Sequence, residues 1–229
     1  MKLAIVGYGK MGKLVEQLAP QFGFEVGLKL DIDNNSNGAG ITPDNFRSID
    51  VAVEFSTPAV VVENIERMAA LGVNLAVGTT GWFDQLSRVR AAVERGGAGL
   101  VYSPNFSVGM QVFSKIVEEA ARRLKNEEDY DAWAYEIHHR MKQDAPSGTL
   151  FKLRQVMEGA GYARRIDVAS NRAGSVPGTH EIGFDSEADT ITLTHTARNR
   201  LGFARGALKA ARWVVGKTGV HEFAEVLFS

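Results

Sequence analysis

A glycine-rich turn near the start of the chain constrains the fold more than any other feature. The apolar run Leu3–Val6 predicts a short strand that is buried on both faces. It ends directly at Gly7-Tyr8-Gly9-Lys10-Met11-Gly12, and from there the apolar residues follow a helical period as far as Pro20. A strand that passes into a helix through G-x-G-x-x-G is the arrangement that holds the pyrophosphate of a dinucleotide.

Each glycine of this turn has its own physical reason. The first permits the tight turn, the second lets backbone N–H groups approach the pyrophosphate, and the third lets the helix pack closely on the strand. Asp31 follows the second predicted strand, nineteen residues after Gly12, where a carboxylate would accept hydrogen bonds from ribose hydroxyls. We therefore expect an NAD(H) or NADP(H) cofactor, with a glycine-rich turn that binds nothing as the alternative.

The choice between the two nicotinamide cofactors is less constrained. The carboxylate of Asp31 would repel the 2′-phosphate of NADPH, which favours NADH. Lys10 and Lys29 lie near enough in the sequence to offset that repulsion, so use of both cofactors stays open.

Strands and helices alternate through the first 105 residues. This alternation predicts an α/β domain with a doubly wound parallel sheet of the Rossmann type. After the first strand, the expected strands cover residues 24–30, 51–55, 73–77 and 100–102, with helical patterns between them. A polar stretch at residues 33–38 predicts an exposed turn.

Two loops follow the fourth and fifth predicted strands. They are Gly78-Thr79-Thr80-Gly81 and Ser103-Pro104-Asn105-Phe106. Ligands of open α/β sheets bind beyond the carboxyl ends of the strands, so both loops are candidates for contact with a nicotinamide. Taken alone, each loop fits an ordinary turn between a strand and a helix better than a ligand site.

The pattern changes after this point. A long helix starts near residue 108, a second helix covers residues 150–157, and strands are expected at 132–138, 166–170, 179–184 and 190–196. This order predicts an α+β domain on a mixed or antiparallel sheet. We expect residues 108–198 to form a substrate-binding and oligomerisation domain, and residues 1–107 and 199–229 to form the dinucleotide-binding domain, completed by a helix over 203–215.

The composition excludes several classes of protein. With 26 Lys and Arg against 27 Asp and Glu, the chain lacks the basic excess of a nucleic-acid or membrane-surface binder. It has no cysteine, which rules out disulfides and thiolate chemistry and fits a reducing compartment. The apolar start is too short for a signal peptide, and no segment is long enough for a membrane span. We expect a cytoplasmic protein without a nucleic-acid or membrane partner.

The largest concentration of candidate catalytic and binding residues lies between Glu136 and Thr149. His138 at a strand end is a natural proton donor, and Lys142 adds a positive charge in the loop that follows. Ser147-Gly148-Thr149 places unpaired N–H groups at a helix start, which suits a carboxylate or phosphate, although Ser147 or Thr149 could equally be an N-cap alone. Adjacent histidines on a strand point to opposite faces, so we expect no metal site at His138 and His139.

The same segment resembles the signature of the 4-hydroxy-tetrahydrodipicolinate reductase (dihydrodipicolinate reductase) family. The resemblance rests on the pattern of residues 136–149, Glu-x-His-His-x-x-Lys-x-Asp-x-Pro-Ser-Gly-Thr. The glycine turn and the stretches at 78–81, 105–109 and 178–181 are similar to others of that family and occur in its order. The chain departs from the family in a glycine turn one residue shorter, in Leu150, and in lacking an arginine directly after Asp31.

The resemblance implies reduction of 4-hydroxy-tetrahydrodipicolinate with NADH or NADPH, with loss of water, in lysine and diaminopimelate biosynthesis. It implies His138 and Lys142 as catalytic residues and a homotetramer assembled through the second domain. It assigns a cyclic dicarboxylate substrate to His139, Ser147, Gly148 and Thr149, and less directly to Arg200. Two alternatives remain: another Rossmann-type NAD(P)-dependent dehydrogenase, and an NAD(H)-binding sensor without turnover.

Overall fold

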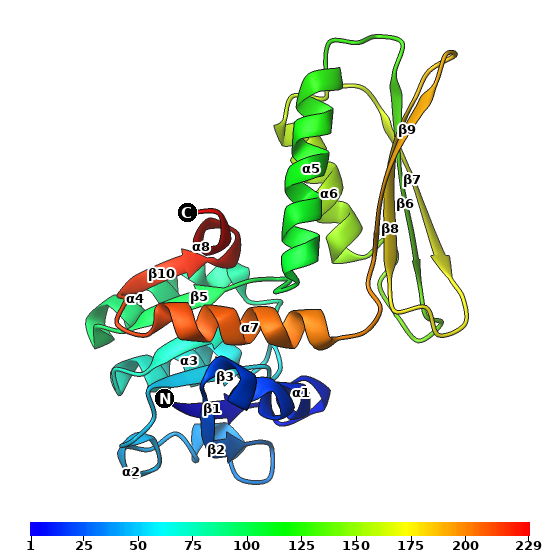
Figure 1. Ribbon diagram of the computed structural model, residues 1–229. Helices are drawn as coiled ribbons and strands as arrows, with labels where there is room; N and C mark the ends of the chain where they lie inside the picture. Colours follow the sequence, from blue (N-terminus) through cyan, green and yellow to red (C-terminus); the bar gives the residue numbers. More distant parts are fainter. The chain divides into compact units, whose positions relative to one another are not determined.

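Two sheets organise the chain in the computed structural model, which describes residues 1–229 (Figure 1). Each sheet belongs to its own compact unit. The first unit contains Met1–Val108 and Leu201–Ser229, and the second contains Gly109–Arg200. The Rossmann-type α/β fold with a second, mixed-sheet unit is therefore confirmed as predicted.

The first unit has a parallel sheet of six strands in the order β10-β5-β4-β3-β1-β2. Its strands are β1 (Lys2–Val6), β2 (Glu25–Leu30), β3 (Val51–Glu54), β4 (Asn74–Val77), β5 (Gly99–Tyr102) and β10 (Gly219–Glu222). Strand β1 lies between β2 and β3, and its apolar run is buried on both faces. Alternate residues of the run therefore enter two separate hydrophobic cores.

Helices cover both faces of this sheet. One core contains residues of α2 (Pro43–Phe46), α3 (Val61–Ala70) and α4 (Leu86–Gly96). The other contains residues of α1 (Lys10–Leu18), α7 (Leu201–Val214) and α8 (Phe223–Phe228). Helix α7 lies against β3 and β4, where its alanines allow close packing on the strands (Figure 1).

Short elements of this unit were not predicted. Strand β10, helices α2 and α8, and the 3₁₀ turns Ala19–Phe22, Ser36–Gly38 and Phe83–Gln85 add to the expected set. Phe24, expected in the second strand, precedes β2 as a buried loop residue. β10 escapes a pattern search because its four residues include the polar pair His221 and Glu222.

The second unit has a four-stranded sheet in the order β7-β6-β8-β9. Its strands are β6 (Asp131–His138), β7 (Ile166–Arg172), β8 (Thr179–Asp185) and β9 (Thr190–Thr196). β6 pairs parallel with β7 and antiparallel with β8, so the sheet is mixed. Helices α5 (Val108–Leu124) and α6 (Gly148–Gly159) pack on one face, and the other face carries no helix (Figure 1). None of the helices in either unit combines the length and apolar composition that a membrane crossing needs.

Candidate functional site

The glycine turn between β1 and α1 has the geometry that a pyrophosphate requires. Gly7 has φ +88°, and a Cβ atom there would lie 2.3 Å from the carbonyl oxygen of Phe55. A Cβ on Gly12 would lie 2.5 Å from the carbonyl oxygen of Gly7, so α1 packs on the turn only because no side chain intervenes. A Cβ on Gly9 would meet no atom within 4 Å, which leaves its backbone open to a ligand.

The three remaining residues of the turn differ in their surroundings. Lys10 is exposed and Met11 is half-buried on the first turn of α1. The hydroxyl of Tyr8 donates a hydrogen bond to Glu16, whose carboxylate also pairs with Lys29 at 3.0 Å. Lys29 lies over the Tyr8 ring, with its ammonium 4.9 Å from the ring centroid. The ion pair with Glu16 thus partly neutralises the charge of Lys29, whereas Lys10 makes no ion pair.

Asp31 directly follows β2, at the carboxyl end of the strand, and is exposed. Its backbone N–H donates to Asn34 Oδ1 at 2.7 Å. No cation pairs with its carboxylate, so an anionic group at this edge of the sheet would meet an uncompensated negative charge.

The loops after β4 and β5 use their side chains internally. Thr79 Oγ1 donates to Glu54 Oε2 at 2.5 Å, and Ser103 Oγ donates to the Asn105 carbonyl oxygen at 2.8 Å. The Phe106 ring is buried against Phe223, with ring centroids 4.9 Å apart. Of these predicted cofactor residues, Thr79, Ser103 and Phe106 therefore offer backbone groups rather than free side chains, while Gly78, Thr80, Pro104 and Asn105 are at least partly exposed.

Glu54, a residue that the sequence analysis missed, anchors one of these loops. It is fully buried at the end of β3 and accepts hydrogen bonds from Thr79 and from the Ser56 hydroxyl and N–H. Burial raises the pKa of Glu54, and the hydrogen bonds from Ser56 and Thr79 oppose that rise. An acid at the carboxyl end of an otherwise apolar strand was the available signal.

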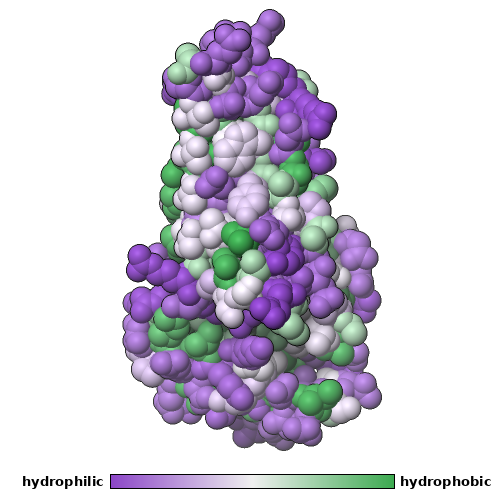
Figure 2. Space-filling view, turned by 90° about the vertical axis from the view of Figure 1, so that its right-hand side faces the viewer, coloured by the Kyte–Doolittle hydropathy of each residue, from purple (hydrophilic) through white to green (hydrophobic).

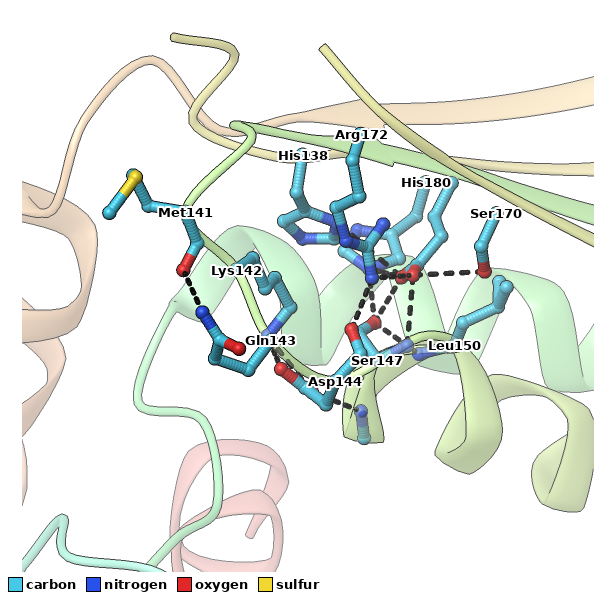
Figure 3. Close-up of polar contacts among 12 residues, drawn as sticks. His138, Met141, Lys142, Gln143, Asp144, Ser147, Leu150, Ser170, Arg172 and His180 are labelled. Carbon is cyan, nitrogen blue, oxygen red and sulfur yellow. Dashed lines mark hydrogen bonds and ion pairs between the residues drawn. The ribbon is translucent and has the colours of Figure 1, made fainter. Parts of the chain in front are cut away.

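A second buried carboxylate organises the histidine segment of the second unit (Figure 3). Glu136 on β6 is fully buried, and its Oε1 accepts from the Ser147 N–H at 2.8 Å, Ser170 Oγ at 3.1 Å and Arg172 Nη2 at 3.0 Å. The Ser147 hydroxyl donates to the other oxygen. Burial by itself raises the pKa of Glu136, but the hydrogen bonds from Ser147 and Arg172 outweigh it and the pKa is lowered.

His138 and Glu136 share a face of β6, as their spacing predicts. Nδ1 of His138 lies 3.5 Å from Glu136 Oε2, and the imidazole is almost fully buried. Burial lowers the pKa of His138, Glu136 opposes that effect, and the cations of Lys142 and Arg172 add to it. The protonation of His138 therefore depends on the charges of Glu136, Lys142 and Arg172.

His180 on β8 completes this cluster. Its Nε2 lies 3.4 Å from Glu136 Oε2 and 3.3 Å from Ser147 Oγ, and its ring meets that of His138 edge to face at 5.0 Å. Burial, followed by repulsion from His138, lowers the pKa of His180 to about 4, so His180 is neutral at physiological pH.

The three side chains Glu136, His138 and His180 bring potential metal-ligand atoms within 4.8 Å of one another. Glu136 is already saturated by hydrogen bonds, and the guanidinium of Arg172 beside it opposes a second cation. The expectation that this segment holds no metal stays a prediction.

The Ser147-Gly148-Thr149 part of the motif lies at the start of α6. Ser147 is the N-cap, and its Oγ accepts from the Leu150 N–H at 3.2 Å. Because the serine is buried and its hydroxyl engaged by Glu136, what this turn offers a ligand is backbone, including the N–H of Thr149. Lys142 pairs with Asp144 at 2.7 Å, and Asp144 also accepts from the Gly148 N–H at 3.4 Å. The loop thus brings Lys142, Asp144 and Gly148 together.

Two predicted substrate residues lie apart from these contacts. His139 is half-buried directly after β6, and Arg200 is exposed directly before α7. Neither makes an ion pair.

Ser170, Arg172 and His180 were not among the predicted site residues. They lie on neighbouring strands 34 to 44 positions after Glu136, so only the strand pairing brings them to it.

A doubly wound parallel sheet with an open glycine turn, joined to a unit that carries a buried histidine and a serine-capped helix start, defines an NAD(P)H-dependent oxidoreductase. Two family models, described as the N-terminus and the C-terminus of dihydrodipicolinate reductase, match residues 1–106 and 109–227. The chain belongs to the dihydrodipicolinate reductase family, which confirms the resemblance seen in the motif.

Curated relatives agree with this membership. A protein of Christiangramia forsetii named 4-hydroxy-tetrahydrodipicolinate reductase is 34% identical over 238 aligned positions, which cover 99% of this chain and 98% of that protein. A protein of the same name from Methanoregula boonei is 40% identical over 193 positions, covering 78% of this chain and 74% of the relative.

Solved structures share the fold. Dihydrodipicolinate reductase from Paenisporosarcina sp. TG-14, solved with dipicolinate bound, superposes with a TM-score of 0.80 at 24% identity and covers 97% of both chains. GenD2 from gentamicin A biosynthesis, solved with NAD, gives a TM-score of 0.60 at 12% identity and covers all of this chain and 92% of GenD2.

Proposed function

We propose that the protein reduces 4-hydroxy-tetrahydrodipicolinate to tetrahydrodipicolinate. In the balanced reaction, the substrate, NAD(P)H and one proton give tetrahydrodipicolinate, NAD(P)⁺ and water. The single observation that carries this proposal is the contact network in the second unit, where a proton donor, a lysine and a helix start belong to one motif of the family.

The residues of the first unit fit a dinucleotide. The open backbone at Gly9, the close approaches at Gly7 and Gly12 and the N-terminus of α1 would hold the pyrophosphate, and Asp31 would hold the ribose. The exposed parts of the loops at 78–81 and 103–106 would contact the nicotinamide end. When bound, the reduced nicotinamide supplies the hydride.

The two carboxylates of the substrate need cations and N–H donors. Lys142 would supply a cation and His139 a further hydrogen-bond donor, and the N–H groups of Gly148 and Thr149 would bind a carboxylate at the start of α6. Ser147 contributes by fixing the first turn of the helix from within. Arg200 is a further candidate for a substrate carboxylate.

His138 would deliver the proton. Reduction of a conjugated imine leaves an enamine-like carbanion that must be protonated at carbon, and a nearly buried imidazole 3.5 Å from a carboxylate suits that step. Nδ1 faces Glu136, so Nε2 is the atom left to donate, directly or through water. A Cβ on Gly178 would lie 2.9 Å from Nε2, so any larger residue at this position would crowd that atom.

A coupled assay tests this function. The substrate is generated in the assay by the synthase that produces 4-hydroxy-tetrahydrodipicolinate. NADH or NADPH is then added, and the loss of absorbance of the reduced nicotinamide is followed. We expect oxidation that depends on both components. If other hydroxy- or amino-acid substrates support it instead, the protein is a different dehydrogenase; if NADH binds tightly without oxidation, it is a sensor.

We expect NADH to be the better cofactor, because Asp31 faces the ribose edge uncompensated and Lys29 is partly engaged by Glu16. Asp31→Ser would remove the repulsion and raise kcat/KM for NADPH relative to NADH by about tenfold. The control is Asp33→Ser in the exposed loop that follows. A wild-type enzyme that uses NADPH as well as or better than NADH would contradict the expectation.

We also propose that the protein works in the cytoplasm and that the uncovered face of its second sheet assembles it into a homotetramer. Seen from that side, pale residues of intermediate hydropathy run down the sheet, with hydrophilic residues gathered at its top and right (Figure 2). Trp133, Tyr135 and Val168 line a shallow hollow of about 300 Å³ on it. Light scattering after size exclusion should give about 100 kDa, four times the 24.9 kDa chain; a monomer mass at micromolar concentration would refute the assembly.

A further inference from the structure

The carboxylate of Glu136 is the one buried charge that contacts both halves of the candidate site. It lies 3.5 Å from Nδ1 of His138, and it accepts two hydrogen bonds from Ser147, the residue that caps α6. We propose that Glu136 is a positioning residue that orients His138 as a proton donor, fixes the start of α6 beside it, and is balanced in charge by Arg172. This inference rests on the proposed function, in which His138 donates a proton.

The groups that surround the His138 imidazole fix its orientation. On one side, Nδ1 faces Glu136 Oε2, and on the other, Nε2 faces the backbone of Gly178, where a Cβ would approach to 2.9 Å. The ring of His180 packs edge to face against the same imidazole. A carboxylate beside Nδ1 favours the tautomer with the proton on that atom, which presents Nε2 to a ligand.

Charged and titratable groups from several elements face His138 and change its pKa. Glu136 on β6 and Asp144 in the following loop stabilise the imidazolium, whereas Arg172 on β7 and Lys142 in the loop destabilise it. His180 on β8 is neutral at physiological pH because burial and repulsion from His138 lower its pKa. Glu136 therefore raises the pKa of His138 against the lowering effects of burial, Lys142 and Arg172, which favours the protonated imidazole.

Arg172 carries the opposite charge to Glu136 and contacts it directly. Its Nη2 donates to Glu136 Oε1 at 3.0 Å and also to the carbonyl oxygen of Asp144, so it links β7 to the loop that carries Lys142. Removing either residue would disturb the packing in a similar way, while the electrostatic consequences for His138 differ in sign. That difference separates a role in positioning and charge balance from a purely structural one.

The two substitutions should shift the pH dependence of the activity in opposite directions. Activity requires protonated His138, so kcat/KM falls as the pH rises through its pKa. In Glu136→Gln the stabilising charge is lost, the pKa falls, and the decline moves toward acid by about one pH unit. In Arg172→Gln a destabilising charge is lost, and the decline moves toward higher pH.

The experiment measures the pH profile of kcat/KM from about pH 5.5 to 9 for the wild type and both variants. We expect Glu136→Gln to lose about tenfold more activity relative to the wild type at the alkaline end than at the acid end. Glu158→Gln on α6, which removes an exposed carboxylate paired with Arg154, is the matched control and should leave the profile unchanged. Losses that are equal at every pH in both variants would overturn the proposal.

A second measurement does not depend on turnover. With ¹³C-labelled histidine, the imidazole of His138, one of five histidines and assigned by its absence in His138→Ala, is titrated by NMR. Its pKa should fall in Glu136→Gln and rise in Arg172→Gln. If Glu136→Gln does not fold, the absence of an upward shift in Arg172→Gln overturns the proposal by itself. If the wild type shows no turnover, the proposed function fails while the titration still decides this inference.

Discussion

His138→Ala should lower kcat by at least about 100-fold, the usual scale for a positioned general acid. The imidazole is the only group in contact with Glu136 that can donate a proton to a substrate carbon at neutral pH, because His180 has a pKa of about 4 and Arg172 does not deprotonate. Steady-state kinetics in the coupled assay measure the loss, and NADH binding followed by fluorescence should be unchanged.

The control for this substitution is His221→Ala, which removes a half-buried histidine on the edge strand β10 whose Nε2 contacts the Thr218 carbonyl oxygen at 2.9 Å. It should retain near wild-type activity. Turnover of His138→Ala within a few fold of the wild type would remove His138 from the proposed mechanism.

Lys142→Ala should lower kcat/KM by at least about 100-fold, since a charge-assisted contact with a substrate carboxylate is lost in a partly buried setting. The ammonium is paired with Asp144 in the structure, and Asp144 accepts a hydrogen bond from the Gly148 N–H, so Asp144 links the lysine to the start of α6. The loss should be larger at low substrate concentration than at saturation if the contact serves binding.

Lys152→Ala on α6 removes an exposed lysine of the same unit without an ion pair, and it should leave the kinetics unchanged. Lys142→Arg should recover part of the activity because the charge is kept while its geometry changes. Equal kinetics for Lys142→Ala and the wild type would show that the substrate carboxylates are bound elsewhere.

The first unit was predictable because its strands are short apolar runs bounded by glycine, and that signal depends only on local sequence. Leu3–Val6 before Gly7 is the clearest case, and it forms an interior strand of the sheet, between β2 and β3. Strand β10 was missed because His221 and Glu222 make its four residues look like a loop, although the strand pairs with β5 along its whole length. The pairing of a short polar strand is decided by the tertiary fold rather than by its own residues.

The candidate site divides in the same way. The proximity of Glu136 and His138 follows from a spacing of two on one strand, and the capping role of Ser147 follows from its place before a helix. Arg172 and His180 could not be placed from local sequence, because their approach to Glu136 depends on the parallel register of β6 with β7 and the antiparallel register with β8. Local patterns predict which residues share an element, whereas the charges that tune them come from strand order.

The discontinuity of the first unit has a consequence for biosynthesis. Its sixth strand and the helix that covers one core come from the last 29 residues, after the whole second unit has been made. While a ribosome is still translating residues 109–200, the nascent N-terminal segment exposes the strand edge of β5 and the apolar surface that α7 will cover. Such a segment is expected to need chaperone protection until release, so premature termination near residue 200 should yield aggregated rather than partly active protein.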